Sequence, residues 1–213
     1  MELDVVIDVV CPWCFVGKRQ LEKAVSMRPG VIDNIKYRPY QLGPDTPSGG
    51  IDRKVYYDRN FGENSEQLRI MRKHLHDAGA GLGINFDFES DCIIANTLDA
   101  HRLIRWSMSE GLQSRVAEGI MVRYFEENKF IGDHGLLCEI AEEAGMDGEL
   151  VTELLKSDRD VALIKDEVAN AARLGITGVP FLIFDGKYSV SGAQDADTLV
   201  KVMDQIQAQT AAG

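Results

Sequence analysis

The sequence has few cysteines for its length, no long apolar run and no excess of basic residues. Its 213 residues include only four cysteines, which are too few for a disulfide framework in a chain of this size. No apolar run in the sequence approaches the roughly 20 residues that a membrane-spanning helix needs. These absences argue against a disulfide-rich scaffold and against a transmembrane protein.

The charge of the sequence is strongly acidic, with a formal net charge of −11. Proteins that bind nucleic acid usually present a basic face, so nucleic acid is not an expected partner. The first residues, Met1-Glu2-Leu3-Asp4, lack the basic segment and the small-residue cleavage site of a secretory signal peptide. We therefore expect a cytoplasmic protein that binds neither nucleic acid nor membranes.

The composition is that of an ordinary globular protein, with 45% hydrophobic and 27% charged residues. The length suits one domain with an insertion, or two small domains. The sequence does not distinguish a monomer from a homodimer.

The chemistry of the sequence is concentrated in Cys11-Pro12-Trp13-Cys14, which follows the apolar run 5–10 and precedes an amphipathic helical pattern. Two thiols at this spacing, between a strand and a helix, favour thiol–disulfide chemistry. If Cys11 is the N-cap of the helix, unpaired N–H groups and the helix dipole stabilise its thiolate. Cys14 lies one turn inward and is expected to be buried and protonated. This pattern predicts that Cys11 is the nucleophile and Cys14 the resolving thiol.

Two other interpretations of the cysteine pair are half of a zinc site and two inert core thiols. Zinc generally needs four ligands, and the sequence has no second C-x-x-C. Cys92, Cys138 and His101 would have to be brought together by the fold. We therefore expect no metal and no bound cofactor besides the redox-active Cys11–Cys14 pair, with glutathione as a candidate co-substrate.

The pattern along the chain predicts an α/β protein. Residues 3–10 are expected to form a strand, 12–27 a helix with Lys18 and Glu22 facing solvent, and 34–42 a second strand, which together make a parallel βαβ unit. After the loop 43–50, helical patterns dominate from about 52 to 174. Strands at 180–184 and 187–191, joined by an Asp185-Gly186 turn, and a helix at 195–208 complete a ββα half.

These elements predict a thioredoxin-like fold (βαβ + ββα) with a large all-helical insertion. We expect residues 1–45 and 172–213 to form the thioredoxin-like domain and residues 46–171 the insertion domain. In such folds a proline at the position of Pro180 is cis and lies beside the dithiol. Pro180 and the backbone of Val179 are therefore expected to bind substrate together with Pro12 and Trp13.

The sequence resembles the DsbA-like thioredoxin superfamily, and more closely its FrnE-like branch of disulfide oxidoreductases. The resemblance spans essentially the whole chain. It is carried by the stretches Asp8–Gly17, Asn96–Leu103, Gly175–Phe181 and Val190–Gln194. It implies a nucleophilic Cys11, a resolving Cys14, a cis Pro180 and protein or small-molecule disulfides as substrates.

One departure from the family concerns the residue before the second cysteine. The periplasmic oxidases carry a histidine within the C-x-x-C, whereas this sequence has Trp13, whose indole carries no charge. We therefore expect a less acidic Cys11 and a less oxidising couple. A reductase or isomerase role also suits the reducing cytosol better than net oxidation.

Several other residues have both a functional and a structural interpretation. Asp8 is a candidate proton acceptor for Cys14 or a polar anchor for the loop; alternatively, it is a strand-end carboxylate that faces water or caps the next helix. Asn96 and His101 are candidates for lining the cleft, or for making local hydrogen bonds only. Trp13 either lies exposed beside the thiols or packs against the insertion. Cys92 and Cys138 are expected to be buried small hydrophobes.

Two other functions were weighed. The kappa-type glutathione transferases and hydroxychromene-carboxylate isomerases share the fold but use a single Ser or Cys, so Cys14 argues against them. A peptide-binding chaperone would need neither thiol. The sequence leaves the physiological substrate, the direction of electron flow and the redox partner open.

Overall fold

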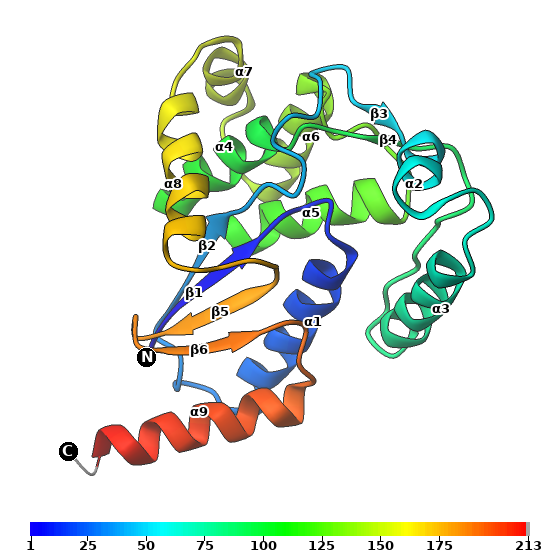
Figure 1. Cartoon of the computed structure of the whole chain (residues 1–213). Helices are drawn as coiled ribbons and strands as arrows, with labels where there is room; N and C mark the ends of the chain where they lie inside the picture. The colour runs from blue at the N-terminus through cyan, green and yellow to red at the C-terminus, as the bar shows by residue number, and fades with distance from the viewer. Residues whose placement is uncertain (212–213) are drawn as a thin grey trace.

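The computed structural model describes residues 1–211 and is built around a four-stranded mixed sheet of order β2-β1-β5-β6 (Figure 1). β1 (Glu2–Ile7) pairs in parallel with β2 (Asn34–Pro39) and antiparallel with β5 (Phe181–Phe184). β5 continues through a tight turn into β6 (Tyr188–Ser191). Strands from the N-terminal and the C-terminal parts of the chain thus form one sheet.

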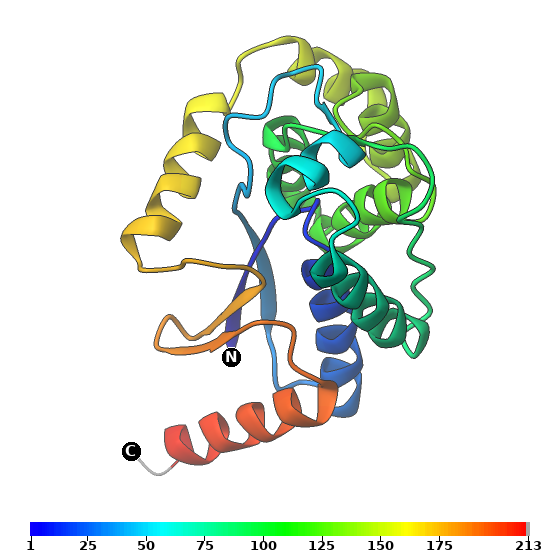
Figure 2. The same ribbon diagram turned by 45° about the vertical axis from the view of Figure 1, so that its right-hand side comes forward.

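The alternation of side chains along β1 places helices on both of its faces. Leu3, Val5 and Ile7 join the main core, which includes α1 (Pro12–Met27), whereas Val6 faces Ala171 of α8 (Val161–Arg173). Figure 2 shows α1 and α8 on opposite sides of the sheet. α9 (Ala196–Ala211) packs along α1. The expected thioredoxin-like arrangement, βαβ followed by ββα, is confirmed.

The insertion between the two halves is mainly helical, as expected. Its helices besides α8 are α2 (Arg53–Phe61), α3 (Glu66–Ala80), α4 (Leu98–Trp106), α5 (Gln113–Phe125), α6 (His134–Ala144) and α7 (Gly148–Lys156). A 3₁₀ turn, η1 (Ser107–Glu110), follows α4. The domain boundaries at 45/46 and 171/172 remain a prediction.

The insertion also contains a short ribbon that the sequence pattern did not indicate. β3 (Ile51–Asp52) pairs antiparallel with β4 (Ile93–Ile94), at the start of a stretch expected to be helical. This pairing joins segments far apart in the chain, so local periodicity carries no signal for it. The insertion is therefore helical apart from two very short strands.

β1 and its parallel neighbour β2 both end earlier than their apolar patterns suggest. β1 ends at Ile7, and the chain then turns, with the carbonyl of Asp8 accepting the N–H of Cys11 at 3.0 Å. β2 ends at Pro39, which has no N–H to offer the sheet. The early end of β1 sets Cys11 at the start of α1.

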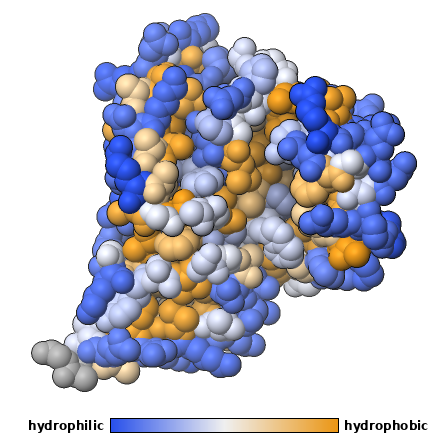
Figure 3. All heavy atoms as spheres, in the orientation of Figure 1, coloured by the Kyte–Doolittle hydropathy of each residue, from blue (hydrophilic) through white to orange (hydrophobic). Residues whose placement is uncertain are grey.

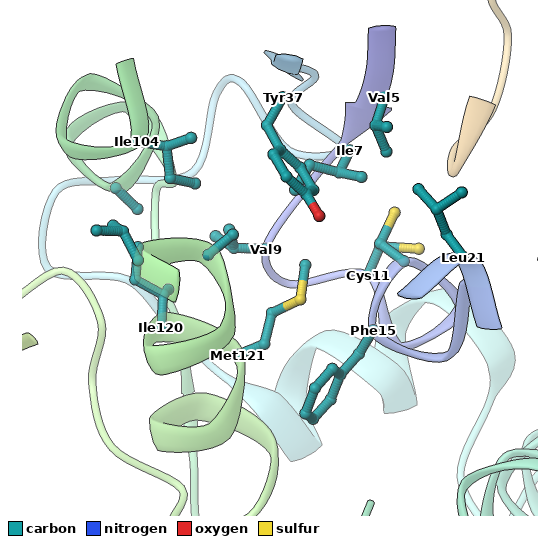
Figure 4. Close-up of a cluster of buried hydrophobic side chains, with 14 of the residues drawn as sticks. Val5, Ile7, Val9, Cys11, Phe15, Leu21, Tyr37, Ile104, Ile120 and Met121 are labelled. Atoms are coloured by element: carbon teal, nitrogen blue, oxygen red, sulfur yellow. The ribbon is translucent and has the colours of Figure 1, made fainter. Parts of the chain in front are cut away.

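The core continues from the sheet into the insertion without a break. Figure 4 shows side chains of β1, α1 and α5 in one cluster, with Met121 of α5 near Phe15 of α1. α1 therefore packs on both the sheet and the insertion.

The expectation that Lys18 faces solvent is wrong. Its side chain is only 2% exposed, and its Nζ donates to Glu22 Oε1 at 2.6 Å and to Glu118 Oε2 of α5 at 2.7 Å. Burial opposes its charged form, but Tyr37 and the two carboxylates outweigh that effect and raise the pKa of Lys18. The sequence of α1 alone could not show that α5 covers this face.

Among residues 1–211, no helix combines the length and the apolar character that crossing a membrane requires.

Candidate dithiol site

Cys11 occupies the N-cap of α1, as predicted. Its backbone is extended (φ −89°, ψ 113°), and Pro12 takes the first helical position. The Cys11 carbonyl accepts the N–H of Cys14 at 3.0 Å. No side chain caps this helix end among the described residues. The first-turn N–H groups and the helix dipole are therefore available to a negative charge on the Cys11 sulfur.

Cys14 lies one turn further along and is completely buried. Burial raises the pKa of Cys14 well above its ordinary value, and the neighbouring Cys11 adds to the rise. The backbone N–H of Asp8 partly opposes it. The Cys14 thiol is therefore protonated at neutral pH, whereas the Cys11 sulfur lies at the N-terminus of α1. Both cysteines are free thiols.

A distant segment completes the site. The Val179–Pro180 peptide bond is cis, as predicted, and the Cys11 Sγ donates to the Val179 carbonyl at 3.6 Å. The ring of Pro180 lies against α1 at Gly17, where an added Cβ would meet Pro180 Cγ at 2.9 Å. Gly17 thus allows the close approach that sets the Val179 carbonyl beside the thiol.

Asp8 and His101 meet in the buried region behind the dithiol. Asp8 is fully buried, its Oδ2 accepts the N–H of Leu42 at 2.7 Å, and its Oδ1 has no hydrogen-bond partner among residues 1–211. His101 Nε2 lies 3.4 Å from that Oδ1 and donates to the Tyr40 carbonyl at 2.9 Å. The interpretation of Asp8 as a water-facing carboxylate or helix cap does not hold.

Asn96 has a different environment. Its Nδ2 donates to the carbonyls of Thr46 and Pro44, at 2.8 and 3.3 Å. Its Oδ1 accepts from Leu98 N at 3.0 Å and from Gln41 Nε2 at 3.1 Å. These hydrogen bonds hold the loop after β2 against the start of α4, so its contacts are structural.

Trp13 is half-buried and packs at the edge of the main core, between the two expected arrangements. Pro12 and Val179 are also half-buried, whereas Pro180 is buried. Apolar side chains gather in a hollow at this end of α1, between the sheet and α2–α3 (Figure 3). These four residues thus lie at the same end of α1 as the thiols.

Cys92 and Cys138 lie away from the pair. Cys92 is buried as expected, and its Sγ faces the Ile93 carbonyl at 3.8 Å. Cys138 is only half-buried, which differs from the expectation, because it lies on the side of α6 that meets Thr152 of α7, 3.1 Å from its hydroxyl. Within residues 1–211, no cluster of three or more His, Cys, Asp or Glu side chains has the arrangement of a metal site.

Sequence reasoning missed Tyr57 of α2. Burial is the main cause that raises the pKa of Tyr57, and Cys11 contributes through its negative charge. Tyr57 therefore lies within electrostatic reach of the Cys11 sulfur. No local signal could reveal this, because α2 reaches the dithiol only through the fold of the insertion.

Comparisons with known proteins identify the family of the chain. The chain is 28% identical to a probable DsbA oxidoreductase of Streptomyces coelicolor, with a TM-score of 0.85 over 96% of this chain and 89% of that one. It is 24% identical to YwbO of Bacillus subtilis, an uncharacterised protein, over 97% of this chain and 98% of the relative. The cytosolic disulfide reductase DsbM of Pseudomonas aeruginosa, solved with glutathione, shares the fold at 16% identity, with a TM-score of 0.63 over 100% of this chain and 98% of that one. The model of the DSBA-like thioredoxin domain matches residues 2–204, so the chain belongs to that family.

Proposed function

We propose that the protein is a dithiol–disulfide oxidoreductase in which Cys11 is the nucleophile and Cys14 the resolving thiol. The observation that carries the proposal is the asymmetry of the pair. Cys11 lies at the N-cap of α1 beside the Val179 carbonyl, whereas Cys14 is buried with a raised pKa. One sulfur is placed to attack, and the other stays protonated until a mixed disulfide has formed.

The reaction balances without a bound cofactor. The Cys11 thiolate attacks one sulfur of the substrate disulfide, the substrate S–S bond breaks, and one substrate thiolate leaves. Cys14 then loses its proton and attacks the Cys11 sulfur, which expels the second substrate thiolate. The substrate gains two electrons and the protein gains the Cys11–Cys14 disulfide. A thiol donor must reduce it again, and glutathione is our candidate.

Asp8 is the proposed proton acceptor for Cys14. Its carboxylate is buried, its Oδ1 lacks a hydrogen bond to any residue from 1 to 211, and its charge is close enough to contribute to the raised pKa of Cys14. His101 lies 3.4 Å from the same oxygen and is placed to stabilise the carboxylate after the proton has moved on. The pair thus links the resolving thiol to α4.

The substrate is proposed to bind across the apolar hollow at the start of α1. The Val179 backbone is available for contacts with the substrate chain, and Pro12 and Trp13 flank the thiols. Because Trp13 supplies no positive charge, we propose a couple less oxidising than that of the periplasmic oxidases. This favours a reductase or isomerase in the cytoplasm.

The test compares three variants in the reduction of a model disulfide. Cys11→Ser should abolish exchange, and Cys14→Ser should accumulate a mixed disulfide that mass spectrometry detects. Full activity of Cys11→Ser would overturn the proposal. A glutathione-dependent isomerase would instead keep its activity in Cys14→Ser, and a chaperone would keep it when both cysteines are replaced by serine.

A further inference from the structure

The insertion contains a cavity of about 780 Å³ that the proposed mechanism does not use. It lies between α2, α3 and the segment 88–92, and its lining includes the cationic side chains of Arg53, Lys54, Arg69, Arg72 and Lys73. The chain as a whole carries a net charge of −11, so this gathering of cations departs from its general character. Cations grouped in a cavity favour an anionic ligand.

The guanidinium of Arg72 is oriented by its neighbours in a way that suits such a ligand. Its guanidinium lies over the Tyr57 ring at 5.7 Å and the Phe88 ring at 5.8 Å, so two aromatic side chains fix its plane. Its buried Nε has no hydrogen-bond partner within residues 1–211. Its Nη1 reaches Glu89 at 3.3 Å, but that carboxylate side chain is 85% exposed. A planar guanidinium with an unused N–H matches the geometry of a carboxylate.

Arg53 adds a second incompletely bonded cation. Its side chain is 4% exposed, and its one side-chain hydrogen bond in the described structure joins Nη2 to the Ser90 carbonyl at 2.6 Å. No carboxylate of residues 1–211 lies within ion-pair distance of it. A buried cation without a paired anion is unfavourable, so an anion in the cavity would relieve this arrangement.

The other charges of the cavity are less available. Arg69 is paired with Glu66, and Lys73 with Asp77. Of the carboxylates that line the cavity, Asp52 is the N-cap of α2 and accepts the N–H of Val55. Asp58 and Asp91 also line it, without an ion pair to either arginine in the part of the chain described. The two incompletely bonded arginines therefore differ from Arg69 and Lys73, which are already paired.

A series of packed aromatic rings runs from the dithiol helix to the cavity lining. Tyr57 lines it and lies close enough to Cys11 for a thiolate there to contribute to its raised pKa, of which burial is the main cause. Phe15, the residue after Cys14, meets Phe86 edge-on at 6.1 Å, and Phe86 stacks on Phe88 at 5.1 Å. Phe88 in turn carries Arg72.

We propose that this cavity binds the carboxylate of a small anionic disulfide whose sulfurs are presented to Cys11. The inference rests on the proposed function and names its substrate class: low-molecular-weight disulfides that bear carboxylates. Arg72 and Arg53 are the proposed carboxylate ligands. A neutral or cationic disulfide would react at the same thiol without using them.

The first experiment measures the single-turnover rate at which reduced protein reacts with three disulfides of similar size. These are 3,3′-dithiodipropionate (anionic), 2-hydroxyethyl disulfide (neutral) and cystamine (cationic). Because the three differ in intrinsic reactivity, each variant is compared with wild type on the same disulfide. Arg72→Gln should slow the anionic reaction about tenfold, as loss of a charge-assisted hydrogen bond implies, and leave the other two within about twofold.

Two matched variants sharpen this result. Arg123→Gln removes the same charge outside the cavity, from a guanidinium of α5 already held by Glu127 and Glu143, and should change no rate by more than about twofold. Arg72→Lys keeps the charge without the planar fork and should recover part of the anionic rate. An equal loss with all three disulfides in Arg72→Gln, or the same loss in Arg123→Gln, would overturn the inference.

The second experiment needs no variant, so a misfolded Arg72→Gln cannot hide the answer. Suberate has the shape of dithiodipropionate without its sulfurs. It should compete with dithiodipropionate for wild-type protein, whereas 1,8-octanediol should not; equal effects of the two would contradict the site. If wild type reacts with none of the three disulfides, the proposed function itself fails. If it reacts with all of them but suberate does not compete, only the carboxylate site fails.

Discussion

Two buried polar clusters that involve neighbouring residues of α4 differ in how completely they are bonded. In the first, Arg102 is 2% exposed and donates to the carbonyls of Arg159, Leu154 and Ser157 and to the carboxylate of Asp99. We call this the Arg102 cluster. In the second, the Asp8 cluster, Asp8 Oδ1 has no hydrogen bond within the described residues and His101 lies 3.4 Å away.

This difference in bonding distinguishes a cluster with a structural role from one that can take part in proton transfer. A buried charge with every nitrogen hydrogen-bonded can only hold its surroundings in place, because any change of partner costs hydrogen bonds. A buried carboxylate with an unused oxygen can accept a proton without giving up a bond. His101 and Arg102 are adjacent in sequence, so α4 carries the two roles on two of its sides. The following predictions test this distinction.

The largest effect is expected for Arg102→Met, which removes the centre of the Arg102 cluster. Three backbone carbonyls and the Asp99 carboxylate lose their donor, so the free energy of unfolding should fall by about 3–5 kcal/mol. Chemical denaturation measures this loss. The rate of disulfide exchange per folded molecule should stay the same.

Arg105→Met is the control for Arg102→Met. Arg105 is on the same helix, but its ion pair with Glu167 is partly exposed, so the loss should be about 1 kcal/mol or less. A loss at Arg105 equal to that at Arg102 would show that full bonding in the buried cluster has no special weight.

Asp8→Asn should have the opposite profile. The amide oxygen can still accept the N–H of Leu42, so stability should change little, but the amide cannot take a proton from Cys14. We expect the resolution step to slow about 100-fold, the low end for a lost acid–base group. Stopped-flow measurement of mixed-disulfide decay gives this rate, and the deficit should shrink as pH rises and hydroxide replaces the carboxylate. A resolution rate equal to that of wild type would remove Asp8 from the mechanism.

The buried Cys14, next to the Asp8 cluster, should make the stability of the protein depend on pH in the alkaline range. The pKa of Cys14 is raised well above 9.0 in the folded protein, mainly by burial, so above pH 9 the unfolded chain loses this proton first. The native state then binds more protons, and stability falls as pH rises, by at most about 1.4 kcal/mol per pH unit. Cys14→Ala should flatten this slope between pH 9 and 10. An unchanged slope would mean that Cys14 titrates alike in both states.

The dithiol half of the molecule could be predicted from the sequence because its signals are local. An apolar strand, a proline at the first helical position and two cysteines one turn apart define the start of α1 within a few residues. The second signal, Gly178-Val179-Pro180 at the start of a strand, is also confined to a few residues. The family resemblance then joined the two segments, which the Cys11–Val179 contact brings together.

The remainder could not be predicted because it depends on contacts between distant segments. Lys18 has the pattern of an exposed residue and is buried only because α5 supplies Glu118. The incomplete bonding of Asp8, the arginine cavity and the β3–β4 ribbon all arise from how the insertion folds back on α1. Periodicity reports which face of a helix is apolar, not which neighbour covers a charge.

The smallest effect is expected where bonding is complete but burial is absent. Arg28, at the end of α1, donates from Nε and Nη2 to both oxygens of Asp204 in α9, each at 2.8 Å, and both side chains are exposed. Water replaces these bonds when the pair is broken, so Arg28→Gln should shift the thermal midpoint by no more than about 1 °C, and less at high salt. A shift as large as that of Arg102→Met would mean that bonding alone, without burial, decides stability. The contrast between the two buried clusters would then lose its physical basis.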